Sequence, residues 1–295
     1  IYQSRIALLL LLLPITLSSC GIFGDKDDER EKTKALTESQ LYERVQELLD
    51  DKNYTLAVEN LQLLESRFPF GVYADQSQLE IIYAYYKSGD EAAAIAAAER
   101  FLRLHPNHPY ADYAWYMKGL ANYTLKPGLL SRFYDTDFAA RDVQPAKKSF
   151  REFESFLNYY PESAYAADAR VRMINIKETL ARHEIIVANY YIQRRAYTAA
   201  INRAKNALEE FSRSEAVGDA LAVLAYCYYR IDAPELAEKQ LAVLKLNFPQ
   251  HQSLDAEGNF EYGADYDAYK KSFINRISLG FLDAPRPPTF DSRRS

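Results

Sequence analysis

A segment of 17 residues recurs five times in the chain, and this repetition limits the possible folds more than any other feature. The copies are residues 53–69, 90–106, 145–161, 196–212 and 233–249. Four copies end in proline and the fourth ends in serine, and the first and last pairs are both spaced by 37 residues. A fixed period in this range is typical of solenoids, in which each unit buries its apolar face against its neighbours.

Each copy has the pattern of an amphipathic helix that packs closely against another helix. Its ninth and twelfth positions are mainly apolar, which gives an apolar stripe at helical spacing. The closing proline cannot continue a helix, so we expect each helix to end there. The fifth position is always small, which lets a neighbouring backbone approach: Ala57, Ala94, Ser149, Ala200 and Ala237.

A partner helix is expected before each copy. These helices are predicted at residues 38–51, 73–88, 110–125, 183–195 and 215–231. Small and aromatic residues on the first helix, small then bulky residues on the second and a closing proline resemble the tetratricopeptide repeat. The sequence therefore predicts an all-α, right-handed solenoid of five helix pairs over residues 38–249. Asp75, Asp112 and Asp168 recur just before or within the predicted first helices, where we expect them to act as caps.

Two insertions and a C-terminal extension depart from this array. Residues 126–143 open with a Pro-Gly turn and are expected to form a loop with a short helix. Residues 164–182 are expected to form an extra helix before the fourth repeat. Residues 250–295 contain a polar stretch, a predicted helix at about 264–281 and a proline-rich tail, and the sequence assigns them no role.

The N-terminus has the features of a secretion signal. Arg5 precedes an apolar run of eight residues, which is too short to span a membrane as a helix. The stretch Leu17-Ser18-Ser19-Cys20-Gly21 looks like a bacterial lipobox, with residues 1–19 as the cleaved signal and 20–37 as a lipidated flexible tether. Cys20 is then the predicted S-diacylglycerol and N-palmitoyl cysteine, which attaches the chain to the membrane. The alternative is an ordinary signal peptide with a coincidental cysteine.

The composition argues against several functions. The net charge is −5, without the basic excess of a nucleic-acid-binding protein. Four histidines and two cysteines offer little for a metal site, and Pro106 breaks the helical spacing between His105 and His108. The sequence contains no nucleophile elbow or glycine-rich phosphate loop. We expect no metal, no cofactor and no enzymatic activity.

Tyrosine is unusually frequent, at 24 of 295 residues, and several tyrosines fall on first helices of the early repeats. A tyrosine offers a flat apolar face and a hydroxyl, which suits an extended peptide with aromatic residues. About half of these side chains are expected in the core instead. The predicted peptide-binding residues are Phe70, Tyr73, Tyr83, Tyr86, Tyr113 and Tyr116.

A second predicted surface is basic. Residues 166–213 contain nine Arg or Lys and five Asp or Glu, in a chain that is acidic overall. Arg194, Arg195 and Arg203 are the predicted contacts to an acidic partner surface. The equal alternative for the basic stretch as a whole is a solvated face without a partner. For Arg194 and Arg195 the equal alternative is a favourable interaction with the dipole of the helix that they end.

The lipobox, the repeats and several phrases together resemble the BamD (ComL) family of lipoproteins. The phrases are Arg67-Phe68-Pro69-Phe70-Gly71, residues 82–87, residues 100–106 and Arg141-Asp142. The resemblance implies a non-enzymatic periplasmic subunit of the outer-membrane β-barrel assembly machinery, lipid-anchored in the outer membrane. Its early repeats would meet unfolded barrel proteins. Its late repeats would dock the periplasmic domain of the BamA-like barrel-inserting protein, and other assembly lipoproteins would attach. The alternative is a periplasmic repeat adaptor for cell-division or peptidoglycan enzymes.

Overall fold

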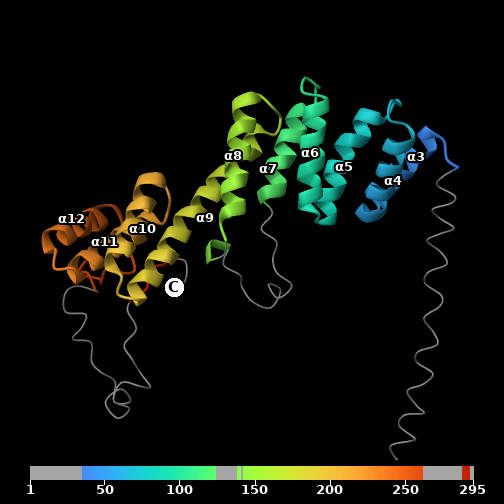
Figure 1. Cartoon of the computed structure of the whole chain (residues 1–295). Helices are drawn as coiled ribbons and strands as arrows, with labels where there is room; N and C mark the ends of the chain where they lie inside the picture. Colours follow the sequence, from blue (N-terminus) through green and yellow to red (C-terminus); the bar gives the residue numbers. More distant parts are fainter. Residues whose placement is uncertain (1–34, 124–137, 141, 262–287, 293–295) are drawn as a thin grey trace, which may run out of the picture. The chain divides into compact units, whose positions relative to one another are not determined.

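The computed structural model describes residues 35–123, 138–140, 142–261 and 288–292, and these are helical apart from their connections (Figure 1). One antiparallel bridge, between Leu254 and Phe260, is the only β pairing in the described part. The all-α prediction is confirmed. The helices are α3 (Glu38–Asp50), α4 (Tyr54–Arg67), α5 (Ala74–Ser88), α6 (Glu91–Leu104), α7 (Ala111–Tyr123), the 3-10 turn η2 (Phe138–Ala140), α8 (Gln144–Tyr159), α9 (Ala166–Gln193), α10 (Tyr197–Glu210), α11 (Val217–Arg230) and α12 (Pro234–Asn247).

The chain divides into two compact units, with the boundary inside α7 after Met117. In the first unit, α3 packs against α4, α4 against α5 and α5 against α6 (Figure 1). One of its core clusters contains Val45, Leu48, Ala57, Leu61, Ile81 and Ala84. In the second unit, α8 to α12 pack in the same sequential manner, and α9 also contacts η2 and α11. Sequential packing of helix pairs is the arrangement predicted from the repeat.

The small residue at the fifth repeat position performs the predicted packing role. All five of these residues are fully buried. At the third copy, the Ser149 hydroxyl donates to the Gly119 carbonyl at 2.8 Å. A Cβ added to Gly119 would lie 2.6 Å from the Phe153 ring, so the absence of a side chain at Gly119 leaves room for this ring of α8 against α7.

The second helix of every repeat ends in the same conformation. Four of them stop two residues before the closing proline, and the residue between leaves the helical region, as expected before proline. The fourth copy has serine instead, yet Phe211 adopts φ −130° like its counterparts. The neighbouring packing therefore fixes this helix end even where the proline is missing.

The turn inside four of the repeats is also shared. A residue in the left-handed region follows the first helix at Lys52, Gly89, Arg195 and Asp232, with φ between 58° and 81°. The next amide closes the turn by donating back to the helix: Asn53 to Leu48, Asp90 to Tyr85, Ala196 to Tyr191 and Ala233 to Tyr228, all at 2.8–2.9 Å. This is the Schellman arrangement.

The prediction of a separate extra helix at 164–182 is wrong. These residues and the predicted helix 183–195 form one helix of 28 residues, α9. The range 166–193 contains no glycine or proline, so nothing in its backbone interrupts the hydrogen-bonding pattern. Helix α9 contacts both α8 and α10.

The predicted aspartate caps are also corrected. Asp75 and Asp168 lie in the first turns of α5 and α9, while Tyr73 and Tyr165 occupy the cap positions without a side-chain cap. Their negative charge still complements the helix N-terminus. Side chains that do cap helices include Asn53 and Asp90, which accept from Leu56 and Ala93.

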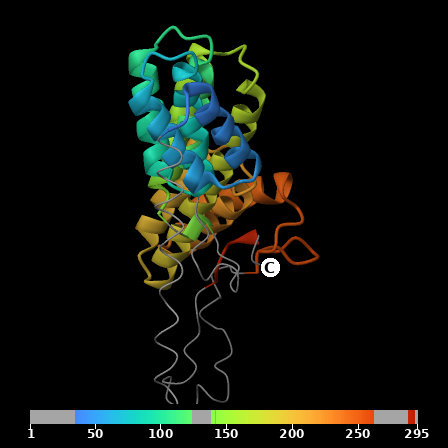
Figure 2. The ribbon, with the colours of Figure 1, turned by 90° about the vertical axis from the view of Figure 1, so that its right-hand side faces the viewer.

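Several predictions fall outside the described residues. These are the signal and most of the tether, the greater part of the first insertion and the helix at 264–281. The end of the C-terminal tail is described at residues 288–292. Figure 2 shows this short red segment beside the orange end of the second unit. Phe290, at its centre, is fully buried.

Candidate partner-binding surfaces

The turn between α4 and α5 presents two exposed apolar side chains. Phe70 is 98% exposed and Val72 is 89% exposed. The adjoining Tyr73 is held in place, because its ring stacks on Tyr42 with centroids 4.1 Å apart and an interplanar angle of 11°. Its amide donates to a Glu38 carboxylate oxygen at 3.0 Å. Phe70 is thus available to a partner beside an ordered aromatic pair.

Tyr42, the partner of Tyr73 in this stack, is held by the Glu80 carboxylate, which accepts hydrogen bonds from several donors. The Tyr42 hydroxyl and the Gln46 amide each donate to Glu80 at 2.9 Å, and Gln76 donates at 2.8 Å. Burial, followed by the hydrogen bond to Glu80, raises the pKa of Tyr42 well above its ordinary value. Tyr42 therefore stays protonated and continues to donate.

The other end of α5 carries a separate aromatic group. Tyr83 is 37% exposed and meets Tyr54 edge-on, with centroids 6.1 Å apart. The Lys87 ammonium lies 5.8 Å from both ring centres, within cation–π range. Tyr86 is half-buried. Tyr73 and Tyr83 are ten residues apart, which on a helix corresponds to about 15 Å.

The two α7 tyrosines differ in accessibility. Tyr113 is half-buried, whereas Tyr116 is only 9% exposed. The prediction that Tyr116 lines a binding surface is wrong, because it shares a buried face of α7 with Leu120, one turn later. The six predicted residues therefore do not form one cluster. Phe70 and Tyr73 lie at one end of α5 and Tyr83 and Tyr86 at the other.

Of the three predicted arginines, two are exposed. Arg194 follows α9 as its C-terminal cap residue, and its guanidinium lies 4.5 Å from the centre of the Tyr190 ring. Tyr190 is itself 49% exposed. Arg195 is exposed and has the left-handed φ of 59° required by the turn. Both side chains are placed to reach a partner.

Arg203 already has an internal partner. Its Nη1 atom donates to a Glu184 carboxylate oxygen at 3.2 Å, and the Glu184 side chain is only 10% exposed. This hydrogen bond is the main reason that the pKa of Arg203 is raised. The Arg203 side chain is 40% exposed, so one function of this residue is to neutralise a buried carboxylate of α9.

The sequence did not indicate the groove that holds residues 288–292. Arg182 donates from Nε and Nη2 to the two carboxylate oxygens of Asp291, both at 3.1 Å. The Asn189 side-chain amide donates to the Phe290 carbonyl at 2.7 Å and accepts from the Phe290 amide at 2.9 Å. Asp219 accepts from the Ser292 amide at 3.2 Å and from its hydroxyl at 3.0 Å.

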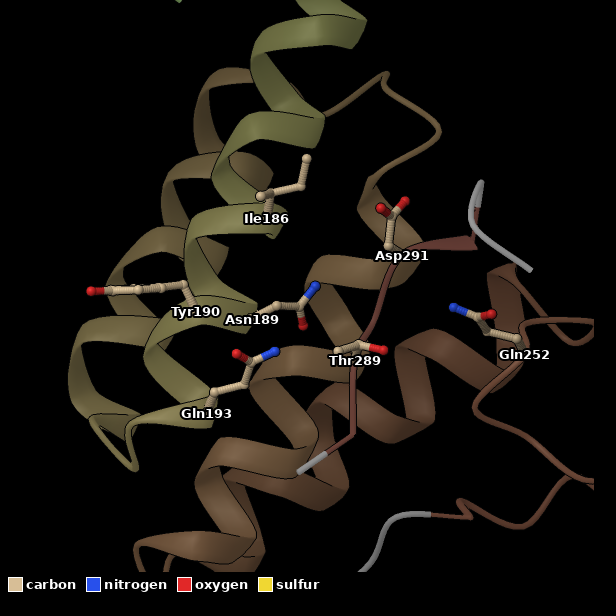
Figure 3. Close-up of a pocket in the computed structure, with 7 residues that line it drawn as sticks. All are labelled: Ile186, Asn189, Tyr190, Gln193, Gln252, Thr289 and Asp291. Atoms are coloured by element: carbon tan, nitrogen blue, oxygen red, sulfur yellow. The ribbon is translucent and has the colours of Figure 1, made fainter. Parts of the chain in front are cut away.

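A cavity of about 300 Å³ flanks this segment (Figure 3). Its lining residues come from α9, from the turn after α12 and from the segment itself: Ile186, Asn189, Tyr190, Gln193, Gln252, Thr289 and Asp291. In Figure 3 the Asn189 side chain points toward the segment, while Tyr190 points away from it. The one signal available in the sequence was Asn189 itself, a polar residue among the apolar positions of α9.

The two early histidines contact a carboxylate. His105 and His108 each place Nε2 at 3.7 Å from an Asp75 carboxylate oxygen. Within the described ranges, no group of three or more His, Cys, Asp or Glu residues is arranged to hold a metal ion. In the same ranges, no helix combines the length and apolar character needed to cross a membrane.

Comparison with known proteins places this helical repeat in a family. The family profile described as YfiO, outer membrane lipoprotein, matches residues 34–244, which include both units' repeats up to α12. The chain belongs to this family. The YfiO match also includes Arg182, Asn189 and Asp219 of the groove, but it ends before residues 288–292.

Curated relatives are similar over most of the YfiO region and beyond. A protein of Neisseria gonorrhoeae named "Outer membrane protein assembly factor BamD" is 39% identical over 243 residues, covering 82% of this chain and 91% of the relative. Proteins with the same name from Vibrio cholerae and from Xylella fastidiosa strain Temecula1 are 36% and 30% identical. The alignments cover 71% and 85% of this chain, and 87% and 85% of those relatives.

Proposed function

We propose that this protein is a lipid-anchored subunit of the machinery that assembles β-barrel proteins in the outer membrane. The observation that carries the proposal is the similarity, over most of the chain, to relatives named as outer membrane protein assembly factors. A stacked array of helix pairs suits a scaffold, since it offers extended surfaces to several partners at once.

The anchor in this proposal is an acylated Cys20, with the repeats on the periplasmic face of the outer membrane. The lipobox around Cys20 supports it, as does the family description as a lipoprotein. The chain acts as a binding scaffold without catalysis.

For the unfolded barrel substrates, we propose two contact points on the first unit. One is the exposed Phe70 beside the Tyr42–Tyr73 stack, and the other is Tyr83 beside Tyr54. Their separation of about 15 Å along α5 corresponds to four or five residues of an extended peptide. Tyr86, on the same helix as Tyr83, and Tyr113, on α7, are both half-buried and are further proposed contacts.

For the BamA-like barrel-inserting protein, we propose docking through Arg194 and Arg195 at the end of α9. Both are exposed, and Arg194 is supported by the face of Tyr190. Arg203 contributes less, because its guanidinium already pairs with Glu184. Other assembly lipoproteins are further expected partners.

The function is tested by identifying what co-purifies with the tagged chain from detergent-solubilised membranes. We expect the barrel-inserting subunit and the other assembly lipoproteins in amounts comparable to the bait. The Arg194→Glu/Arg195→Glu variant is expected to lose the barrel-inserting subunit while remaining folded. Recovery of cell-wall synthases or division proteins in place of these subunits would contradict the proposal.

The substrate surface is tested with a photoreactive amino acid at position 70 or 83 and a labelled peptide from the C-terminal strand of a barrel protein. We expect crosslinks from both positions. Leu246 is an apolar control position, because it is 82% exposed and lies in the second unit. Crosslinks confined to positions beyond residue 180 would show that the site is placed wrongly.

A further inference from the structure

Residues 288–292 are held in the second unit as a peptide is held by a receptor. Residues 288–291 form no helix or strand, and the contacts of the segment come from side chains of the surrounding helices. Twenty-six residues of sequence separate it from the preceding described residue, Glu261. It also lies outside the family match, whereas the groove residues of α9 and α11 lie inside it.

Asn189 binds the main chain of this segment. Asn189 is 7% exposed, and its side-chain amide donates to the backbone carbonyl of Phe290 and accepts from the backbone amide of Phe290. The neighbouring positions Ile185, Ala188 and Ile192 are fully buried and apolar. A buried amide is costly without partners, so this position in α9 is suited to an extended backbone lying against it.

The side chains of Phe290, Asp291 and Ser292 also make specific contacts with the groove. The Phe290 ring packs against Tyr226 at 5.7 Å and stacks on Phe260 at 6.4 Å, with an interplanar angle of 5°. Arg182 grips the carboxylate of Asp291 with two parallel hydrogen bonds, a geometry that favours a carboxylate over a neutral amide. Asp219, which is also held by His251 at 3.0 Å, binds the amide and hydroxyl of Ser292.

The segment does not fill the groove. The cavity of about 300 Å³ beside Thr289 leaves space for a larger side chain just before the aromatic residue. A peptide that carries a bulkier residue there has contacts to gain that the chain's own segment does not make. The groove therefore accommodates more than one sequence.

We propose that the groove formed by α9, α11 and the turn after α12 is a binding site for extended peptides with an aromatic residue followed by an acidic residue. Residues 288–292 occupy it as an internal ligand, and a segment of another polypeptide with the same pattern displaces them. Covalent attachment gives the internal ligand a high effective concentration, so the outside peptide must bind well to compete. This inference goes beyond the proposed function and does not depend on it.

The test is a fluorescence anisotropy titration with a labelled peptide of residues 286–295. The proteins are the native chain and a variant that lacks residues 288–295. We expect the shortened chain to bind the peptide at least tenfold more tightly than the native chain does, because its groove is vacant. Replacing the phenylalanine of the peptide by alanine, or its aspartate by asparagine, should weaken binding at least tenfold.

Variants of the shortened chain locate the site. Asn189→Ala should weaken binding at least tenfold, whereas Ile174→Ala, at an exposed position of the same helix away from the cavity, should change it less than twofold. A full-length Phe290→Ala chain provides a second route, since it keeps its length but loses the aromatic anchor. It too should bind the peptide more tightly than the native chain.

Three outcomes overturn the proposal. The first is a shortened chain that loses its helical circular dichroism, which would make residues 288–292 a permanent part of the core. The second is a folded shortened chain that binds the peptide no better than the native chain. The third is binding that Asn189→Ala leaves unchanged.

Discussion

At the scale of single residues, the described structure gives several buried polar groups specific partners. Glu184 is an example, because its carboxylate is almost fully buried on α9 and its ion pair with Arg203 crosses to α10. An unpaired buried carboxylate is destabilising, so a change at Arg203 acts on the fold as well as on any partner. The two effects have to be measured separately.

Arg203→Met is expected to lower the free energy of unfolding by about 1–2 kcal/mol, in the lower part of the range for an unsatisfied buried group because Arg203 is partly solvent-screened. The double variant Glu184→Gln/Arg203→Met should lose less free energy of unfolding than the two single variants lose in sum. Urea denaturation of the four proteins measures this coupling. Additive losses would show that the pair contributes nothing.

This coupling also determines how docking should be tested. Arg203→Glu places a second carboxylate beside Glu184, and the repulsion would weaken the fold whether or not Arg203 contacts a partner. The matched comparison is Glu184→Gln/Arg203→Glu, in which that repulsion is absent. If only the single variant loses the partner, Arg203 has a structural role.

Cys227 provides a probe of unfolding. Its side chain is fully buried, and this burial raises the thiol pKa to about 12 from an ordinary value of 9.0. In a Cys20→Ala chain it is the only thiol, and we expect no reaction with iodoacetamide at pH 8 until urea unfolds the second unit. Rapid labelling without urea would contradict the burial.

The same shift predicts the direction of a pH effect. The thiol of the unfolded chain ionises near its ordinary pKa, while the folded chain keeps its proton up to about pH 12. Between these values the unfolded state releases the proton first, so this group's contribution to stability is full below pH 9 and declines as the pH rises toward 12. Cys227→Ala should reduce that decline.

At the scale of elements, the repeated left-handed turn allows a matched set of substitutions. Lys52 adopts φ 58° where a side chain is unfavourable, and Gly89 adopts φ 81° at the corresponding position of the second repeat. Lys52→Gly should raise the free energy of unfolding by about 0.5–1 kcal/mol, and Gly89→Ala should lower it by about 1 kcal/mol. Urea denaturation at unchanged m-value is the measurement. If both variants have a lower free energy of unfolding, the Lys52 side chain makes contacts that outweigh the backbone strain.

The features predicted correctly from the sequence are those that local interactions determine. The small fifth residue, the apolar stripe and the closing proline act within one helix or between adjacent helices, so they predict helix pairs and their ends. The wrong prediction of a separate helix at 164–182 has a local cause too. The change in repeat spacing suggests a helix break before residue 183, but the sequence has no glycine, proline or cap there to end the helix.

The features missed are those that depend on residues far apart in the sequence. Asn189 and Phe290 are 101 positions apart, and Arg182 and Asp291 are 109 apart. No periodicity relates them, and residues 288–291 form no helix or strand that a pattern could predict. Tyr116 was misplaced for a related reason. An aromatic residue on a repeat's first helix suits both the core and the binding surface, and only the packing of α7 distinguishes them.

At the scale of the whole molecule, the proposed attachment to the membrane concerns a residue outside the described ranges. No helix in those ranges could span a bilayer, and the proposed anchor is the acylated Cys20. A single acyl chain binds a membrane only marginally, whereas the three chains of a lipoprotein cysteine hold it stably. The proposal therefore makes the location of the chain depend on one residue, Cys20.

The corresponding prediction uses a Cys20→Ala chain whose residues 1–19 are exchanged for a signal peptide cleaved without lipidation, so that no uncleaved signal acts as an anchor. We expect it in the soluble periplasmic fraction, while Cys227→Ala with the native N-terminus stays in the membrane pellet. Fractionation before and after an alkaline wash measures this. Release only by the wash would show that partners hold the unacylated chain at the membrane. Retention after the wash would contradict Cys20 as the anchor, because alkaline conditions break protein contacts but do not extract acyl chains.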